Sequence, residues 1–169
     1  MNERELLEQL GSGLWELAPM ATRERAERLD RSLWAKDFEW ADLKRLAVYT
    51  AAIRLGNGGL LFQEADRQAF MCLILEGRLK IRKNGTGASG FEVAELGPGD
   101  SIGEMSLFDQ QPRSASVVAM SDCILLLLSR ARLVEMKSKE PELASTLIWQ
   151  LARLLSQRLR RTSGLLVAK

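Results

Sequence analysis

The stretch SIGEMSLFDQQPRSASV, residues 101–117, decides how the rest of this chain is interpreted. It places a glycine and a glutamate, Gly103 and Glu104, a short loop ahead of Arg113, which follows a proline. Short apolar runs of strand length flank the stretch on both sides. An acid and a guanidinium so close together have two interpretations. They form an internal ion pair, or they are two halves of a polar site for a small ligand.

The composition is that of one soluble globular domain with room for an extension. The chain has 169 residues, of which 46% are hydrophobic and 27% are charged. Its formal charge of +2 is too small to argue for nucleic acid by itself. The opening residues MNERELLEQL are charged, and no apolar stretch approaches the roughly 18 residues of a membrane span. We expect a cytoplasmic protein that has no membrane segment.

The chain contains no histidine, which excludes many enzyme classes. Histidine-dependent catalytic triads are impossible, and so are most zinc and non-haem iron sites. The two cysteines, Cys72 and Cys123, sit in apolar runs and lack CxxC spacing, so we expect them to be reduced core residues. No catalytic constellation is visible. We therefore expect neither an enzyme nor a metal site.

The hydrophobic pattern changes from helical to β and back to helical along the chain. Up to about residue 50, and again from residue 130, apolar residues recur at the spacing of amphipathic helices. Between these parts, glycine turns separate short apolar runs, which is typical of a β-sandwich or barrel. The runs are LLF (60–62), FMCLILEG (70–77), RLKIRK (78–83), FEVAEL (91–96), SASVVA (114–119) and DCILLLLS (122–129).

We therefore predict a mainly β fold with flanking helices. A helical N-terminal extension covers residues 1–30, the β domain covers 31–140, and a C-terminal helix covers 141–169. One glycine-rich segment, GTGASG (85–90), matches the dinucleotide pattern GxGxxG, but that pattern requires a helix after it. Here FEVAEL follows, which alternates like a strand, so we interpret the segment as a hairpin loop.

The residues after Gly103 predict a site for an anion. GEMSLF is long enough for a short helix, whose first amides, at Met105 and Ser106, lack internal partners and carry partial positive charge. Gly103 lets a ligand approach that backbone closely. Arg113, at the start of the next strand, supplies a full charge and paired donors suited to a phosphate.

Glu104 would repel an anion, so it must serve another part of the ligand. A carboxylate is a good acceptor for vicinal hydroxyls such as those of a ribose. A site that binds an anion and hydroxyl groups beside the apolar mouth of a barrel matches a nucleotide with one phosphate. The alternative, a Glu104–Arg113 salt bridge that holds the loop together, stays open at this point.

Residues 31–163 resemble the cyclic nucleotide-binding domain family. IGEMSLFDQQPRSASV is similar to the family's phosphate-binding cassette, Phe-Gly-Glu-Leu-Ala-Leu, then four variable residues, then Pro-Arg-Ala-Ala-Thr-Val. The matching positions are Gly103, Glu104, Leu107, Pro112, Arg113 and Ala115. The resemblance implies a β-roll (a double-stranded β-helix or jelly roll), with Arg113 on the cyclic phosphate and Glu104 on the ribose 2′-hydroxyl. Two positions depart from the family: Ala65 stands where a glycine is usual, and Ile102 replaces a phenylalanine.

The end of the chain resembles the catabolite activator branch of that family. SQRLRRTSGLL, residues 156–166, is similar to the dimerisation helix there. The resemblance implies that Thr162 and Ser163 contact an adenine across a dimer, with Arg158 nearby. Ser114 could bond either a guanine amino group or the phosphate. The helix favours cyclic AMP over cyclic GMP as the regulatory ligand.

The last helix carries an apolar stripe and a basic face. The stripe consists of Leu143, Leu147, Leu151, Leu154 and Leu155. It predicts a helix that either folds back as a lid or pairs with a second copy, and we expect a homodimer. The basic face consists of Arg153, Arg158, Arg160 and Arg161. We interpret it as a solvated surface, so nucleic acid is not the expected partner.

The predicted function is that of a sensor. Residues 164–169 give no room for a DNA-reading module, which needs several tens of residues. We therefore expect a stand-alone cyclic nucleotide-binding protein of bacterial type that signals to a separate, unknown protein effector. Two alternatives remain: an oligomeric scaffold with a vestigial pocket, and a nucleic-acid-associated regulator that uses the basic C-terminal helix.

Overall fold

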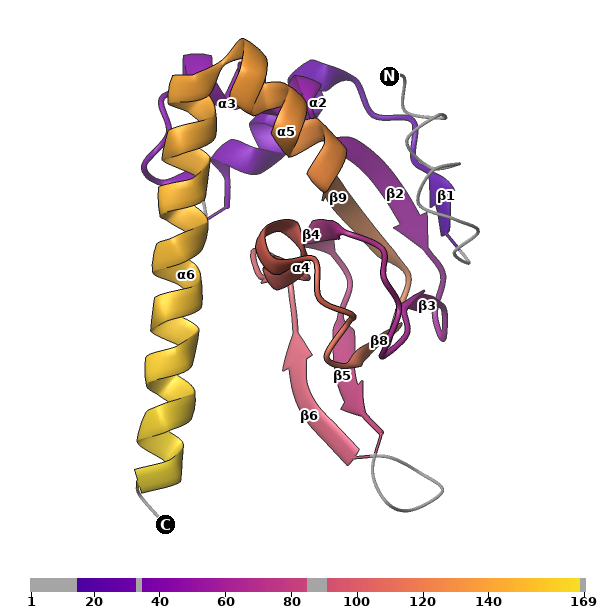
Figure 1. Ribbon diagram of the computed structural model, residues 1–169. Coiled ribbons are helices and arrows are strands. Elements are labelled where there is room, and N and C mark those ends of the chain that lie inside the picture. Colours follow the sequence, from indigo (N-terminus) through magenta and orange to yellow (C-terminus); the bar gives the residue numbers. More distant parts are fainter. Residues whose placement is uncertain (1–14, 33–34, 85–90, 168–169) are drawn as a thin grey trace.

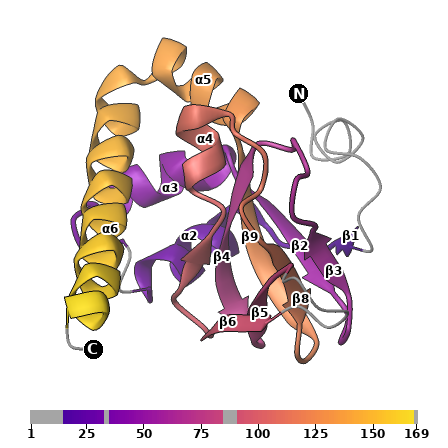
Figure 2. The same ribbon diagram turned by 60° about the horizontal axis from the view of Figure 1, so that its bottom comes forward.

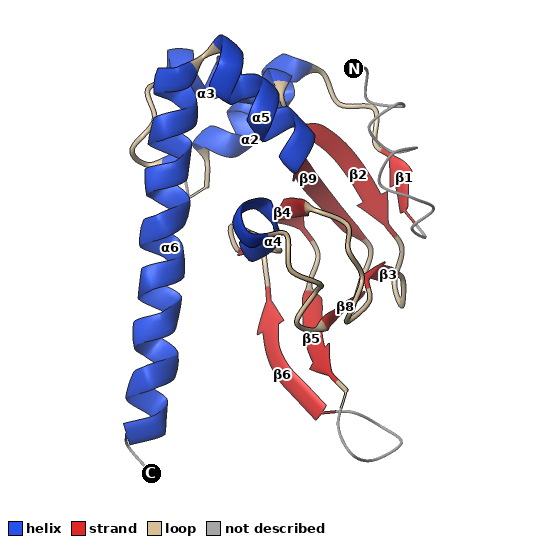
Figure 3. Cartoon of the chain, in the orientation of Figure 1, coloured by secondary structure: helices blue, strands red, loops and turns tan. Residues whose placement is uncertain are grey.

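The computed structural model describes residues 15–32, 35–84 and 91–167. Its helices are α2 (Thr22–Asp30), α3 (Trp40–Val48), α4 (Met105–Asp109), α5 (Arg130–Lys139) and α6 (Pro141–Val167). Two antiparallel sheets, red in Figure 3, form the β domain. In Figures 1 and 2, α2, α3 and α5 gather at one end of the β domain and α6 runs along its side. The predicted mainly β fold with flanking helices is confirmed.

The two sheets have different strand orders. The five-stranded sheet has the order β1-β2-β9-β4-β7, with strands Trp15–Leu17, Ala51–Leu55, Cys123–Ser129, Phe70–Glu76 and Ser101–Ile102. The four-stranded sheet has the order β3-β8-β5-β6, with strands Leu60–Phe62, Ser116–Ala119, Leu79–Lys83 and Phe91–Leu96. Each strand that the apolar runs predict is present.

Strands β4 and β9 are covered on both faces, which explains their unbroken apolar sequences. Phe70, Cys72 and Ile74 of β4 pack between the two sheets. Met71 and Leu73 of the same strand face the other way and pack with residues of the helices. Side chains alternate across a strand, so a strand buried on both sides needs an apolar residue at every position. Full burial of each large side chain contributes about 1.5–3 kcal/mol.

Helix α6 uses its leucine stripe within its own chain. Pro141 is its first residue, where the missing amide hydrogen costs nothing. Leu143, Leu147 and Leu151 are buried in the cluster that also contains core residues of α2, α3 and α5. Leu154 is partly buried against the same cluster. Of the two predicted uses of the stripe, folding back is the one seen, and its first three leucines are not available to a second copy.

Two strands are not among those that the apolar runs predict. Residues 15–17, inside the predicted helical extension, form β1, and residues 51–55, just after the predicted helical part, form β2. Alanine favours a helix locally, but β2 pairs along its whole length with β9, where Ala51 lies opposite Leu127. Pairing with a buried central strand outweighs local propensity, and a helix prediction from periodicity alone does not register it.

Residues 1–14 and the GTGASG loop (85–90) lie outside the described residues, so the predictions that fall on them stay predictions. Within the described ranges, no helix has both the length and the hydropathy needed to cross a bilayer. Cys72 and Cys123 are buried and carry free thiols, as predicted.

Candidate functional site

The turn between β7 and α4 brings the sequence motif into one place. Gly103 has a φ of 88°, a left-handed conformation that favours glycine. A Cβ at this position would lie 2.7 Å from Nη1 of Arg113 and 2.7 Å from the carbonyl oxygen of Phe70. The backbone conformation and the close approach both require glycine here. The guanidinium of Arg113 therefore lies directly against the backbone that leads into α4.

Arg113 is held from several directions. Its guanidinium donates to the carbonyl oxygen of Phe70 at 2.8 Å, to the Ser106 hydroxyl at 2.8 Å and to the carbonyl oxygen of Gly103 at 3.2 Å. The guanidinium carbon also lies 3.9 Å from the ring centroid of Phe62 and 4.5 Å from that of Phe70. These cation–π contacts and hydrogen bonds fix the plane of the guanidinium.

The positive charge of Arg113 is nearly enclosed, since the residue is only 5% exposed. Burial lowers its pKa to about 10, so it remains charged at neutral pH. No carboxylate of the described residues forms an ion pair with it, and its buried Nε makes no hydrogen bond. The alternative of a Glu104–Arg113 salt bridge is therefore wrong. A buried cation without a counter-ion is costly, and a bound anion would supply the missing charge.

Glu104 pairs with helix α6 instead. Nη1 of Arg158 lies 3.0 and 3.2 Å from the two carboxylate oxygens of Glu104. Nη2 of Arg158 donates to the carbonyl oxygen of Ser101 at 2.6 Å, and the Ser101 hydroxyl donates to Glu104. Glu104 is 2% exposed, so this network holds a buried carboxylate. The ion pair fastens the far half of α6 to the β domain.

A cavity of about 650 Å³, which we call the pocket, opens beside these groups. This volume is typical of sites for small organic ligands. Its apolar lining includes Phe62, Ile102 and Val117 of the β domain and Leu155 and Leu159 of α6. Among the described residues there is no cluster of side chains that could hold a metal ion. The pocket thus combines apolar walls with one buried arginine and one buried carboxylate.

Most of the predicted site residues line this pocket. They are Gly103, Glu104, Met105, Ser106, Arg113, Ser114, Arg158 and Thr162. Ser163 is not among the lining residues and lies exposed on α6. The Thr162 hydroxyl donates to the carbonyl oxygen of Arg158 at 3.0 Å, one turn back along the helix. Helix α4 has only five residues, so the positive charge comes mainly from Arg113 rather than from a helix terminus.

Three residues of this site have no signal in the sequence. The Ser101 hydroxyl donates to Glu104, and the Ser101 carbonyl oxygen accepts from Arg158. The rings of Phe62 and Phe70 lie against the guanidinium of Arg113. A serine and two phenylalanines at strand positions look like any other strand residues. Their roles depend on tertiary contacts between strands that are distant in the sequence.

Ala65 keeps a turn that favours glycine. Its φ is 75°, in the left-handed region. The turn is closed by hydrogen bonds from the Ala65 amide to the carbonyl oxygen of Arg113 at 2.9 Å and from the Arg113 amide to the carbonyl oxygen of Asp66 at 2.8 Å. The turn is therefore formed with alanine, at the cost of a left-handed backbone conformation.

Comparison with known proteins relates both the motif and the fold to other chains. The family model described as "Cyclic nucleotide-binding domain" matches residues 52–140. The cyclic AMP receptor protein of Thermus thermophilus is 36% identical over 104 residues, which cover 62% of this chain and 46% of that protein. The chain thus spans less than half of the length of such curated relatives.

Solved structures show the same arrangement. A cyclic nucleotide-binding domain from Methylobacillus flagellatus superposes with a TM-score of 0.80 at 26% identity, covering 92% of this chain and 89% of that one. The catabolite activator protein of Thermus thermophilus superposes with a TM-score of 0.70 at 29% identity, covering 80% and 62%.

Proposed function

The chain belongs to the cyclic nucleotide-binding domain family, and from this we propose that it is a sensor whose pocket binds cyclic AMP in preference to cyclic GMP. The observation that carries the proposal is Arg113, a buried and charged arginine beside a cavity of ligand size, without a counter-ion among the described residues. A cyclic nucleotide carries a single negative charge, which would serve as the counter-ion of Arg113.

The ligand would take over contacts that the protein now makes with itself. A charged phosphate oxygen accepts more strongly than the carbonyl oxygens of Phe70 and Gly103 to which Arg113 now donates. Ser106 and Ser114 lie in the same lining and would add neutral donors to the phosphate. Glu104 would accept from the ribose 2′-hydroxyl.

Helix α6 would transmit the signal. Its Arg158 holds Glu104, so a ribose that bonds Glu104 enters a network which fastens α6 to the β domain. Leu155, Leu159 and Thr162 of α6 line the pocket where a base would lie. Ligand binding would therefore change the position of α6, and a separate protein effector would recognise the altered surface.

We also propose a homodimer through α6, along a seam that shares only Leu155 with the predicted leucine stripe. Ile148, Ala152, Leu155, Leu159 and Thr162 recur at alternating four- and three-residue steps, the spacing of a coiled-coil seam. Leu159 is 68% exposed within the single chain, although it is apolar. In such a dimer, Ser163 would reach the base bound by the other copy.

A thermal melt with and without each cyclic nucleotide tests the proposal. Ligand at 100 times its dissociation constant should stabilise the protein by about 2.7 kcal/mol, which raises the melting temperature by roughly 5–11 °C for a chain of this size. The shift should be larger with cyclic AMP and should be lost in Arg113→Lys, which keeps the charge but not the paired donors. Absence of any shift at millimolar nucleotide would favour the scaffold with a vestigial pocket.

A further inference from the structure

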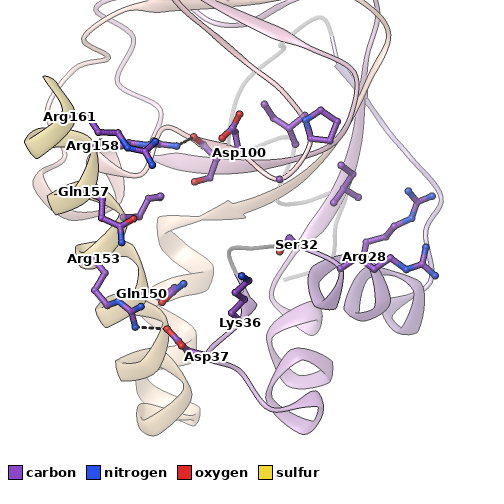
Figure 4. Close-up of a pocket in the computed structure, with 17 residues that line it drawn as sticks. Arg28, Ser32, Lys36, Asp37, Asp100, Gln150, Arg153, Gln157, Arg158 and Arg161 are labelled. Carbon is purple, nitrogen blue, oxygen red and sulfur yellow. Dashed lines mark hydrogen bonds and ion pairs between the residues drawn. The ribbon is translucent and has the colours of Figure 1, made fainter. Parts of the chain in front are cut away.

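A second cavity of about 670 Å³ lies between α2, α6 and the turn that precedes β7 (Figure 4). We call it the basic groove, because six basic side chains line it against two carboxylates. The basic residues are Arg28, Arg31, Lys36, Arg153, Arg158 and Arg161, and the acidic residues are Asp37 and Asp100. The groove is therefore strongly positive, although the whole chain carries a formal charge of only +2.

Part of this positive charge is already neutralised. Arg28 pairs with Glu76 at 2.7 Å, outside the groove lining. Arg153 pairs with Asp37, a contact that Figure 4 marks. Arg158 is engaged by the buried Glu104 (described above). These three cations hold the walls together and are not free for a ligand.

The remaining three cations have no side-chain partner within the part of the chain that the structure describes. Arg31, Lys36 and Arg161 form neither a hydrogen bond nor an ion pair through their side chains with any described residue. They come from three separate segments: the end of α2, the loop before α3, and α6. Figure 4 shows Lys36 between the two helix walls, with Arg161 beside Arg158 on α6. Free positive charge thus surrounds the groove instead of lying on one exposed face.

Arg31, Lys36 and Arg161 line the same concave site. Like charges repel one another, and a concave site of one sign concentrates counter-ions of the opposite sign. Arginine and lysine are the usual side chains that bind phosphate oxygens. Three separate cations around a cavity of this size match a small molecule that carries several anionic groups.

We propose that the basic groove binds a small organic or inorganic polyphosphate, with Arg31, Lys36 and Arg161 as its principal contacts. The apolar side chains Leu75 and Leu154 in the same lining leave a surface for an organic part of the ligand. The site differs from the pocket of Arg113, since Arg158 alone among the described residues lines both cavities. A single phosphate would meet only part of the free charge.

The groove also changes the interpretation of the basic face of α6. Arg153, Arg158 and Arg161 line the groove, whereas Arg160 does not, although it is adjacent in sequence and equally basic. A nucleic acid would contact a continuous basic surface and would use Arg160 as well. A small polyphosphate inside the groove would not contact Arg160.

Isothermal titration of the full chain with inorganic triphosphate tests the proposal, with orthophosphate as the reference at equal ionic strength. We expect one saturable site with a dissociation constant at least tenfold lower for triphosphate than for orthophosphate. Lys36→Gln and Arg161→Gln should each weaken binding at least threefold, and the double variant at least tenfold. Arg160→Gln and Lys137→Gln are matched controls outside the groove and should change binding less than twofold. Thermal melts without ligand would establish that each variant is folded.

Three results would overturn the proposal. The first is the absence of saturable binding. The second is an equal loss in Arg160→Gln, which would indicate the diffuse basic surface that a nucleic acid uses. The third is loss of triphosphate binding in Arg113→Lys, which would place the anion in the pocket. Failure of cyclic AMP to bind would leave the groove variants and their outcomes unaffected, so the two proposals fail separately.

Discussion

The pocket and the basic groove are built from the same residue types but differ in how far these are removed from water. In the pocket, Arg113 is 5% exposed and Glu104 is 2% exposed. In the groove, the side chains of the paired Arg153 and Asp37 are 60% and 45% exposed. Coulomb interactions and desolvation costs are both small near bulk water and large in the interior. Equivalent substitutions at the two sites should therefore have very different effects.

The largest difference is expected between two glycines. Gly103 in the pocket and Gly99 in the groove have nearly the same φ, 88° and 90°. A Cβ on Gly103 would meet the carbonyl oxygen of Phe70 at 2.7 Å, whereas a Cβ on Gly99 would meet nothing within 4 Å. Gly99→Ala should cost about 1–2 kcal/mol of backbone strain, and Gly103→Ala about 3–5 kcal/mol, because strain and overpacking add. Urea denaturation measures the free energy of unfolding of each variant, and equal losses in the two variants would contradict this prediction.

The second difference is expected between two arginines of α6. Arg158→Ala leaves the buried Glu104 without its counter-ion and should cost about 2–3 kcal/mol. Arg153→Ala removes an exposed pair and should cost less than about 0.5 kcal/mol. Adding Glu104→Gln to Arg158→Ala should recover part of the loss, since a neutral amide is cheaper to bury than a carboxylate. Without that recovery, the loss would come from packing of the arginine stem.

The smallest effect is expected at the turn that supports the pocket. Ala65→Gly removes the strain of an alanine in the left-handed region, which is worth roughly 1–2 kcal/mol. It also raises the conformational entropy of the unfolded chain, which costs somewhat less free energy. We expect a net stabilisation of about 0.5–1 kcal/mol, measured as a rise in the urea midpoint. Ala131→Gly in the first turn of helix α5 is the control, and it should destabilise, by at most about 1 kcal/mol. A loss at position 65 as well would show that the turn is not strained.

What the sequence predicts well is local. Gly103 and Arg113 lie close in the sequence, on either side of the short helix α4, so the motif alone places both residues at one site. The apolar runs of β4 and β9 predict buried strands, because continuous burial needs a continuous apolar sequence.

What the sequence fails to predict depends on partners far along the chain. Glu104 is paired with Arg158 rather than with the nearer Arg113, because the fold of α6 brings Arg158 to the carboxylate. Strand β2 exists because β9 is there to pair with it, and Ala51 gives no local sign of this. The leucine stripe of α6 gives an amphipathic pattern without saying whether its partner is the same chain or a second copy.

The position of Cys72 in a strand covered on both faces gives the protein an internal reporter. Burial raises the pKa of its thiol well above the ordinary range, so the reactive thiolate is absent from the native state. A thiol reagent can reach it only when the two sheets separate. Its modification rate then equals the rate of an unstructured thiol multiplied by the fraction of molecules that are open. The cysteine that packs behind the pocket thus measures, without any added label, the fraction of molecules whose β domain is open.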